Sequence, residues 1–509
     1  MFAKTYGSTT LGVNGVLIDV EVDVSRGLPR FDIVGLPDAS VKEAKERVRT
    51  AIKNSGIKMP PGRITINLAP ADIKKDSSGL DLPIGIGLLA AQGLVPEETC
   101  QKSMFAAELS LEGELRGIHG VLPMAINCLK QGIKTLFVAK ENVQEALLVK
   151  GLTVYAATNI RGLLDFLNGN EALQPAVPVA VASGNEALSE DDFSDVQGQF
   201  LAKRALEIAA AGGHNVLMVG VPGSGKTMLA RRVSSILPQL SRQEALEVTK
   251  IYSIAGLLPQ NAGLITSRPF RSPHHTISSA GMIGGGSIPR PGEVTLSHDG
   301  VLFLDELPEF GKATLEVLRQ PLEDGVVTIS RVHSSLSFPS RMILIASMNP
   351  CPCGFNGDDA HACTCSPNEI KRYTKKISGP LLDRIDIHIW VPRVEYKDIV
   401  NPIPAETSEK IRARVEAARG RQTERLSRYK IFCNAQMSHA MLKKMCPLTP
   451  SAQLLLKQVF EKMRLSARSY DRIIKVSRTV ADLDAATEIT DRHVAEAIQL
   501  RNDIGMASI

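Results

Sequence analysis

Residues 220–227 of the chain read Gly220-Val221-Pro222-Gly223-Ser224-Gly225-Lys226-Thr227. An apolar run at 215–219 precedes them and a helix-like stretch at 228–233 follows, which is the strand–GxxxxGK(S/T)–helix order of a phosphate-binding loop. The glycines let backbone N–H groups close around phosphates, and the helix N-terminus adds its dipole. Lys226 would reach the β- and γ-phosphates, and the Thr227 hydroxyl would bind Mg²⁺. The stretch therefore predicts an α/β fold that binds a nucleoside triphosphate.

A second motif provides the carboxylates that ATP hydrolysis needs. It reads Val301-Leu302-Phe303-Leu304-Asp305-Glu306. Its four apolar residues are typical of a buried strand in a parallel sheet, and the two acids follow where that strand ends. Asp305 would hold the Mg²⁺ shell, and Glu306 would polarise the attacking water. Two adjacent acids at a strand end are otherwise commonly solvated turn residues. After a phosphate-binding loop, they predict hydrolysis.

Length and composition indicate the general class of protein. The chain has 509 residues, which corresponds to about three domains. It is 44% hydrophobic, has no apolar run near the ~18 residues that a membrane span needs, and shows no cleavable export segment, so we expect a cytoplasmic protein. The net charge is only +5, but residues 401–480 hold 17 Lys and Arg against 6 Asp and Glu. This local excess indicates either a nearby polyanion or solvated basic helix faces.

Composition and periodicity divide the chain into four segments. Residues 1–170 form a mixed α/β unit, and 171–192 form a linker rich first in Pro, Ala and Val and then in acids. The nucleotide-binding core extends over 193–392, and 393–509 is helical and basic. Within the first unit, Ser40-Val41-Lys42-Glu43 predicts a capping box at the start of a helix.

Three further residues refine the class of the core. Asn349 ends an apolar run that begins at Met342, where it would orient water or the γ-phosphate. Arg384 follows a turn and would act across a subunit boundary as an arginine finger, and Arg468 lies at the start of a helix in the basic terminal region. The resulting order of Walker A, Walker B, sensor 1, arginine finger and sensor 2 resembles the AAA+ ATPases. Glu306, Lys226 and these three residues are the predicted catalytic set.

Two insertions resemble those of the AAA+ clade that contains magnesium chelatase and the MCM helicases. Residues 278–287 look like the helix-2 insert, and residues 326–338 read as two alternating strands around a short turn, like a pre-sensor-1 hairpin. In ring motors of this clade both loops point into the central channel, where Arg331 and His333 would contact DNA. Alternatively, the Gly-rich loop is a flexible insertion and the hairpin an ordinary sheet edge.

The chain over nearly its whole length resembles the ComM/YifB family, the Mg-chelatase-like AAA+ ATPases of bacteria. Beside the motifs above, the resemblance is carried by Gly35-Leu36-Pro37-Asp38, Arg268-Pro269-Phe270-Arg271-Ser272-Pro273-His274-His275, Asn349-Pro350-Cys351-Pro352-Cys353-Gly354 and Leu381–Asp386. It implies ATP and Mg²⁺ as cofactors and a homohexameric motor on single-stranded and branched DNA, promoting branch migration during natural transformation. His274 and His275 are expected to couple the nucleotide site to the pore rather than to bind a metal.

Four of the eight cysteines lie within fifteen residues, as the pairs Cys351/Cys353 and Cys363/Cys365. In a chain without an export signal, this crowding favours thiolate–metal chemistry over disulfides. Four soft ligands on one loop suit tetrahedral Zn²⁺, although the C-x-C spacing is tighter than that of a standard zinc knuckle. His361 could replace one cysteine, and a reduced, metal-free loop is the alternative. The other four cysteines are isolated and expected to be buried or to have no role.

Residues 1–170 resemble the α+β domain shared by Lon proteases and ribosomal protein S5. The segments 75–82 and 112–124 parallel those that carry the catalytic serine and lysine of Lon. The comparison places Leu80 and Met124 at these two positions, and neither provides an activated hydroxyl or a base. We therefore expect a platform that stabilises a ring or binds DNA, ahead of the AAA+ core and a C-terminal helical lid.

Two other functions remain open at this stage. An ATP-dependent protease would need a shifted dyad of Ser77 or Ser78 with Lys130. A motor subunit of a metal-inserting chelatase would share the ATPase core, although such subunits usually lack a Lon-like domain ahead of it. Stimulation of ATP hydrolysis by DNA distinguishes both from a DNA motor.

Overall fold

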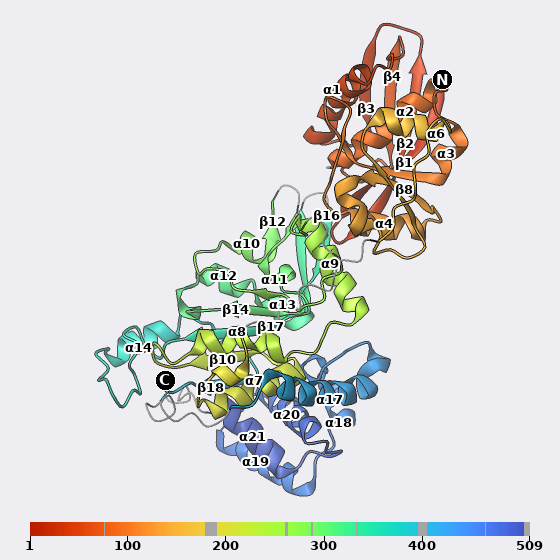
Figure 1. The fold of residues 1–509 in the computed structure, drawn as a ribbon. Helices are drawn as coiled ribbons and strands as arrows, with labels where there is room; N and C mark the ends of the chain where they lie inside the picture. Colours follow the sequence, from red (N-terminus) through yellow and green to blue (C-terminus); the bar gives the residue numbers. More distant parts are fainter. Residues whose placement is uncertain are drawn as a thin grey trace.

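The computed structural model describes residues 1–75, 77–178, 191–259, 263–286, 289–331, 334–394, 405–463 and 465–502. Along the elongated molecule, an N-terminal α/β unit is followed by a central α/β unit, against which the C-terminal helices pack (Figure 1). Among the helices of these residues, none has the length and apolar character that crossing a bilayer requires.

The N-terminal unit is built on a mixed seven-stranded sheet of order β3-β4-β2-β1-β5-β8-β9. The strands are β1 Phe2–Leu11, β2 Asn14–Ser25, β3 Arg30–Val34, β4 Arg63–Ala69, β5 Ser103–Ala106, β8 Thr135–Ala139 and β9 Thr153–Ala157, with β6 Glu108–Leu109 and β7 Leu115–Arg116 as a separate ribbon. The helices are α1 Ala39–Asn54, α2 Asp81–Ala91, α3 Glu97–Lys102, α4 Val121–Lys130, α5 Val143–Ala146 and α6 Ile160–Leu167. In β2, Ile18, Val20 and Val22 are buried at alternate positions, as in a half-buried strand.

The capping box predicted at Ser40–Glu43 is wrong. Helix α1 begins at Ala39, and its N-cap is Asp38, whose carboxylate accepts the backbone N–H groups of Ser40 and Val41. Aspartate is as good an N-cap as serine, and here it precedes the serine by two positions.

The central unit contains a five-stranded sheet of order β11-β14-β17-β10-β18, in which all paired strands are parallel. The strands are β11 Phe270–Arg271, β14 Val301–Leu304, β17 Ile343–Met348, β10 Val216–Val219 and β18 Ile387–Trp390. The chain leaves β10 for the edge strand β11, returns through β14 to β17 beside β10, and then adds β18 on the other side of β10. Ligands bind at such a switch point, at the carboxyl ends of the strands.

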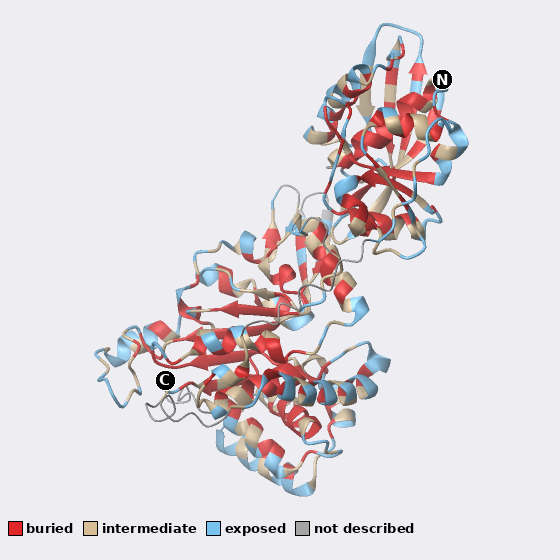
Figure 2. Ribbon diagram, viewed as in Figure 1, coloured by how far each residue is buried: buried red, intermediate tan, exposed pale blue. Residues whose placement is uncertain are grey.

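Both faces of this central sheet are buried. Val216 and Met218 of β10 belong to one apolar cluster, and Leu217 and Val219 to another on the opposite face. Figure 2 shows these strands as a buried layer in the middle of the molecule. The continuous apolar runs seen in the sequence are therefore a consequence of burial on both sides.

The helices around the central sheet come from both the middle and the end of the chain. Those of the central unit are α7 Phe200–Gly212, α8 Lys226–Ile236, α9 Arg242–Ala255, α10 Ser279–Ile283, α11 Glu293–Leu296, α12 Lys312–Glu316, α13 Arg319–Asp324, α14 Pro367–Thr374 and α15 Gly379–Leu382. The C-terminal ones are α17 Ser408–Leu426, α18 His439–Met445, α19 Pro450–Met463, α20 Ala467–Leu483 and α21 Asp491–Asn502. Val415, Val480 and Val494 of the C-terminal helices share one apolar cluster with β10 and α8, so the lid and the core are packed as one body.

The predicted hairpin is present as β15 Val326–Arg331 and β16 Ser334–Pro339, which pair antiparallel from Val326↔Pro339 to Arg331↔Ser334. Phe338 is fully buried, so one face of the hairpin is anchored in the core. The predicted insert at 278–287 contains α10 and β12 Gly284–Gly285, which pairs antiparallel with β13 Arg290–Pro291 beyond the predicted bounds. His333 and the side chain of Arg331 lie outside the described residues.

The N-terminal unit contacts the central unit through α4 and α9. The N–H of Gly120, before α4, donates to the carbonyl of Ser253 at 3.1 Å, and the Ser253 hydroxyl donates to the carboxylate of Glu145. Burial raises the pKa of Glu145. Val13, at the turn between β1 and β2, packs against the cluster that includes Phe338 of the hairpin. The N-terminal unit therefore contacts the base of that hairpin.

A buried carboxylate joins the central sheet to the C-terminal helices. Asp386, just before β18, accepts from Arg472 Nη1 at 2.6 Å and lies 3.3 Å from His214 Nδ1. Burial alone would raise the pKa of Asp386, but the charge of Arg472 and the hydrogen bond with His214 outweigh it and hold that pKa well below its usual value. Since Arg472 belongs to α20, this ion pair fixes the lid helix on the core.

Asp386→Ala should destabilise the core by about 3–5 kcal/mol, because it leaves the partly buried Arg472 and the fully buried His214 without their shared partner. The only tryptophan of the chain, Trp390, lies in β18, so thermal unfolding followed by its fluorescence reports on this region. Because the pKa of Asp386 is lowered on folding, its contribution is present above about pH 4 and declines as the pH falls below that value. Glu409→Ala, which removes an exposed carboxylate from α17, is the control and should shift the transition little. Equal transitions for the two variants would contradict this role of Asp386.

Candidate functional site

The phosphate-binding loop connects β10 to α8 in the predicted order. Gly223 and Gly225 have φ values of +76° and +89°, which the loop needs to turn its N–H groups inward. Lys226 begins α8, and its Nζ donates to the carbonyls of Gly220 at 2.8 Å and Val221 at 3.0 Å. Burial lowers the pKa of Lys226, and the carboxylates of Walker B partly offset that effect. The ammonium group thus lies over the loop where phosphate oxygens would replace these carbonyls.

Asp305 connects the three elements that line this crevice. Thr227 Oγ1, on α8, donates to Asp305 Oδ2 at 2.7 Å, and Ser347 Oγ, on β17, donates to Asp305 Oδ1. The N–H of Gly220 also donates to the carbonyl of Met348 at 3.2 Å, which ties the loop to the end of β17. A carboxylate and a hydroxyl side by side are the oxygen ligands that Mg²⁺ prefers together with phosphate oxygens, so these residues fit the ion.

Glu306 lies beside this group with a strained backbone. Its φ is +53°, a left-handed value that is uncommon for residues other than glycine, and its side chain is 57% exposed. His275 Nδ1 lies 3.9 Å from Glu306 Oε2, and the rings of His274 and His275 are 4.0 Å apart. The exposed carboxylate is accessible to a water molecule, and the His275 loop faces it.

Asn349 also lies in the crevice. Its Oδ1 is 3.4 Å from Lys226 Nζ, so the end of β17 faces the phosphate-binding loop. The structure thus brings together the Walker A residues, Asp305, Glu306 and Asn349. Ser347 belongs to no sequence motif named above, although it precedes Asn349 by two residues at the end of a strand, a spacing that puts both side chains on the same side of the sheet.

Arg384 lies elsewhere, at the amino end of β18. Its Nη1 donates to the carbonyl of Pro380 at 2.7 Å, and Nη2 forms an ion pair with Glu323. Burial lowers the pKa of Arg384, and the nearby charges of Arg319, Arg468 and Arg472 lower it further. Arg468 is thus near enough to Arg384 for its charge to act on it, and Arg384 precedes β18, at the edge of the sheet opposite to the phosphate-binding loop.

The four cysteines of the 351–365 loop converge. Cys351 Sγ lies 3.3 Å from Cys353 Sγ and 3.6 Å from Cys363 Sγ, and all four sulfurs lie within 4.8 Å of one another. Zn²⁺ held tetrahedrally at about 2.3 Å from each sulfur would require S···S separations of about 3.8 Å. The backbone N–H groups of Phe355 and Thr364 lower the pKa of Cys353 to about 5, which favours a thiolate there. At Cys363 and Cys365 the backbone hydrogen bonds are outweighed, in the absence of a metal, by desolvation and the neighbouring Cys353 and Cys351 sulfurs, which raise the pKa of both thiols. The sulfur cluster fits a tetrahedral metal ion.

His361, the predicted alternative ligand, and the four other cysteines do not belong to this sulfur cluster. His361 pairs with Asp358 at 3.2 Å and stacks on Phe355, with ring centroids 5.1 Å apart. The four isolated cysteines are all buried, as expected; they are Cys100, Cys128, Cys433 and Cys446.

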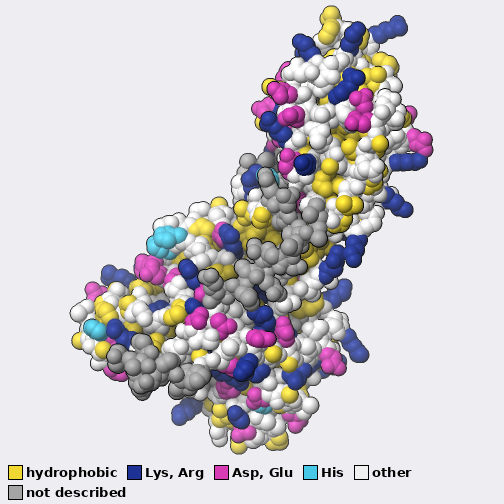
Figure 3. Space-filling model, viewed as in Figure 1, with side chains coloured by type: hydrophobic (Ala, Val, Ile, Leu, Met, Phe, Trp, Pro, Cys, Tyr) yellow, Lys and Arg dark blue, Asp and Glu magenta, His cyan; other side chains and the backbone are white. Residues whose placement is uncertain are grey.

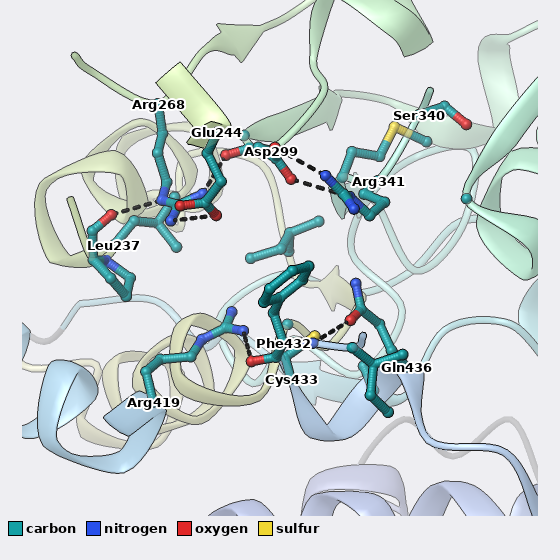
Figure 4. Close-up of a pocket in the computed structure, with 18 of the residues that line it drawn as sticks. Leu237, Glu244, Arg268, Asp299, Ser340, Arg341, Arg419, Phe432, Cys433 and Gln436 are labelled. Carbon is teal, nitrogen blue, oxygen red and sulfur yellow. Dashed lines mark hydrogen bonds and ion pairs between the residues drawn. The ribbon is translucent and has the colours of Figure 1, made fainter. Parts of the chain in front are cut away.

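A cavity of about 650 Å³ lies at the amino ends of β10, β14 and β17, away from the phosphate-binding loop (Figure 4). His298, next to it, lies 3.4 Å from a carboxylate oxygen of Glu247 and 3.2 Å from one of Asp299. The backbone N–H of Arg341 donates to His298 Nδ1 at 3.0 Å, so the ring proton is on Nε2 and no lone pair is left there for a metal. Arg341 Nη2 also lies 2.7 Å from Glu247, and the group is an ion-pair network.

Part of the positive charge of residues 401–480 is neutralised within the fold. Arg414 pairs with Glu207 and Glu406, Arg425 with Asp482, and Arg472 with Asp386. On the face drawn in Figure 3, Lys and Arg side chains are interspersed with acidic ones over the C-terminal helices at the bottom. Of the two interpretations of this basic region, these ion pairs favour solvated and paired helix faces.

Three family models match the chain. One described as "Magnesium chelatase, subunit ChlI" matches residues 192–399, one described as "Subunit ChlI of Mg-chelatase" matches 20–142, and one described as "Magnesium chelatase, subunit ChlI C-terminal" matches 405–501. The first covers the central sheet with both nucleotide-site motifs.

Relatives extend this similarity over nearly the full length. "Competence protein ComM" of Haemophilus influenzae is 43% identical over 503 residues, which cover 98% of this chain and 97% of that protein. "Uncharacterized protein YifB" of Escherichia coli is 43% identical over 499 residues, covering 96% and 95%. The "Magnesium-chelatase 38 kDa subunit" of Rhodobacter capsulatus is 26% identical over 196 residues, which are 35% of this chain and 54% of that protein.

Lys226→Ala should abolish ATP binding, because it removes the cation that lies over the phosphate-binding loop. Glu306→Gln should retain binding and lower hydrolysis by about 100-fold or more, because a general base contributes that much to rate. Glu309→Gln is the matched control, since Glu309 lies three residues away and pairs with Lys376 on the surface. Binding of a fluorescent nucleotide and release of phosphate measure the two effects. Hydrolysis by Glu306→Gln at the rate of the control would show that Glu306 is not the base.

Proposed function

Because the chain belongs to the ComM/YifB family of Mg-chelatase-like AAA+ ATPases, we propose that it is an ATP-driven motor that translocates on DNA as a homohexameric ring. In this proposal the Walker A loop binds ATP, Thr227 and Asp305 hold Mg²⁺, Glu306 activates water, and Asn349 orients it. The similarity to a protein named for competence supports natural transformation as the process, in which the motor would promote branch migration.

The placement of Arg384 carries the proposal of a ring. Parallel strands β10 and β18 pair from Val216↔Ile387 to Val219↔Trp390, with the phosphate-binding loop after β10 and Arg384 before β18. The two sites are thus at opposite ends of a four-residue strand, which is about 10 Å long at 3.3 Å per residue. Arg384 faces away from its own nucleotide, so it would complete the site of a neighbouring copy. An arginine at the transferring phosphate stabilises the charge of the transition state.

DNA would pass through the channel of the ring and contact the hairpin β15–β16. One face of the hairpin is anchored through Phe338, and the strand pairing reaches Arg331 at the other end. Arg331 and His333 are the proposed contacts with DNA. Contacts of this kind with phosphates are electrostatic and independent of sequence, as a translocating motor needs.

A motor subunit of a magnesium chelatase is the second candidate, because all three family models carry that description. A Lon-like protease is a weaker one. Leu80 and Met124, at the positions of the serine and lysine, are buried in two different apolar clusters. In the proposal the N-terminal unit is a platform for the ring or for DNA. ATPase activity measured with single-stranded, duplex and four-way-junction DNA tests the choice, since indifference to DNA would favour the chelatase.

A structural Zn²⁺ at Cys351, Cys353, Cys363 and Cys365 is part of the proposal. The convergence of the sulfurs supports it, as do the backbone N–H groups of Asn356 and Cys353, which donate to Cys351 Sγ at 3.3 Å and Cys365 Sγ at 3.4 Å. When bound, such an ion fixes a loop and takes no part in hydrolysis.

Mixing Arg384→Ala chains with Lys226→Ala chains should restore part of the ATPase activity that each lacks alone. Some interfaces then pair an intact phosphate-binding loop with an intact arginine from the neighbour. Mixing Arg384→Ala with the double variant Lys226→Ala/Arg384→Ala is the control and should restore nothing. If mixed rings form, as judged by size, and no activity returns, Arg384 does not act across the interface.

Arg331→Ala together with His333→Ala should reduce DNA-stimulated ATPase and unwinding while leaving basal hydrolysis largely intact, because the nucleotide site is untouched. Each lost phosphate contact should reduce the slope of log affinity against log salt by about one unit. Thr328→Ala, an exposed neutral position on the same strand, is the control and should behave like the parent. If the double variant binds and unwinds DNA as the parent does, the hairpin has only a structural role.

A further inference from the structure

The cysteine loop is in direct contact with the phosphate-binding loop. Gly354, at φ +87°, lies so close to Pro222 that a Cβ added at Gly354 would be 2.6 Å from Pro222 Cγ and 2.8 Å from Cδ. The backbone of one loop is therefore packed on the proline ring of the other, with no room for a side chain between them. Gly354 directly follows Cys353, so this contact is one residue away from a proposed metal ligand.

Both ends of the cysteine loop are anchored beside the nucleotide site. Cys351 is fully buried and follows Asn349 by two residues, and Asn349 Oδ1 faces Lys226 Nζ. After Cys365 the chain enters α14, where the phenol of Tyr373 interacts with the backbone N–H of Asn349. Burial raises the pKa of Tyr373, which keeps the phenol neutral. A shift of the cysteine loop would therefore act on Asn349 through the chain at Cys351 and through the contact with Tyr373.

The middle of the loop is held by the strand on the other side of β10. A Cβ added at Gly357 would lie 3.4 Å from the ring of Trp390, the last residue of β18. Asp358 pairs with Arg393, beyond the end of β18, at 3.2 Å. The loop thus extends from β17 to β18, the two neighbours of β10, and passes over Pro222.

We propose that the metal-bound cysteine loop sets the position of the phosphate-binding loop, so that metal occupancy and nucleotide affinity are coupled. The inference rests on the proposed Zn²⁺ site and ATPase. Without metal, the four thiols no longer share a ligand, and the segment that presses Gly354 on Pro222 is free to relax. Because coupling between two binding sites is reciprocal, bound nucleotide must also slow the loss of metal.

The coupling is tested on the full-length protein with zinc itself as the probe. Elemental analysis should find one zinc per chain, and a chelator should remove it several-fold more slowly when Mg²⁺ and a non-hydrolysable ATP analogue are bound. The zinc-free chain should bind a fluorescent nucleotide about tenfold more weakly, equivalent to about 1.4 kcal/mol, and added zinc should restore the affinity.

A substitution that spares the cysteines separates the contact from the metal. Gly354→Ala should keep its zinc and bind nucleotide about tenfold more weakly, because its Cβ displaces Pro222. Gly357→Ala is the matched control, since Gly357 also has a left-handed φ of +81° in the same loop but lies against Trp390 rather than Pro222. It should keep both zinc and nucleotide affinity within about twofold.

These experiments distinguish a failure of the metal site, of the coupling and of the proposed ATPase. A parent chain that contains no zinc and takes none up contradicts both the metal site and the coupling, whereas its nucleotide binding still tests the ATPase. If zinc is present but its removal and Gly354→Ala both leave the affinity unchanged, the coupling alone is wrong. A parent chain that binds no nucleotide contradicts the proposed function and, with it, the coupling.

Discussion

The position of one carboxylate determines how the nucleotide site is assembled. Asp305, at the end of β14, accepts hydrogen bonds from Thr227 on α8 and from Ser347 on β17. The ends of two strands and the start of the helix after the phosphate-binding loop are thereby held at one point. Because all strands of this sheet are parallel, their carboxyl ends meet on the same edge. Glu306 and Asn349 each follow one of these strands, so they reach the crevice without a long connection.

In the proposed ring, the same parallel arrangement would make each chain depend on its neighbour. Arg384 precedes a strand and therefore lies at the edge opposite to the crevice, where Glu323 holds its guanidinium. Arg319 and Arg468 contribute further positive charge near it, as their effect on the pKa of Arg384 indicates. A face that concentrates arginines away from the chain's own phosphates is suited to the phosphates of another copy. The geometry of the sheet thus provides a reason for assembly that is independent of any similarity to other proteins.

Three contacts join the parts of the molecule. At the nucleotide site, the cysteine loop packs on the phosphate-binding loop and spans the two strands beside it. At the opposite edge of the sheet, the ion pair of buried Asp386 with Arg472 fixes the lid on the core, with which the lid also shares an apolar cluster. Farther away, Val13 of the N-terminal unit packs in the cluster that anchors the hairpin β15–β16.

The sequence alone determined the features that depend on neighbouring residues. Local patterns revealed the phosphate-binding loop, the strand before Asp305, the α/β class and the crowded cysteines. Each of these features depends on the backbone conformation, the burial or the ligand type of a few consecutive residues. Only the tertiary structure decided the contacts between distant segments: Glu323 with Arg384, Gly354 with Pro222, and the pairing of basic C-terminal residues with acids from the core. Sequence predicted an excess of positive charge there, but neutralisation depends on partners up to 207 positions away, as for Arg414 and Glu207. Such pairs depend on how the layers pack, and no local period or motif specifies that packing.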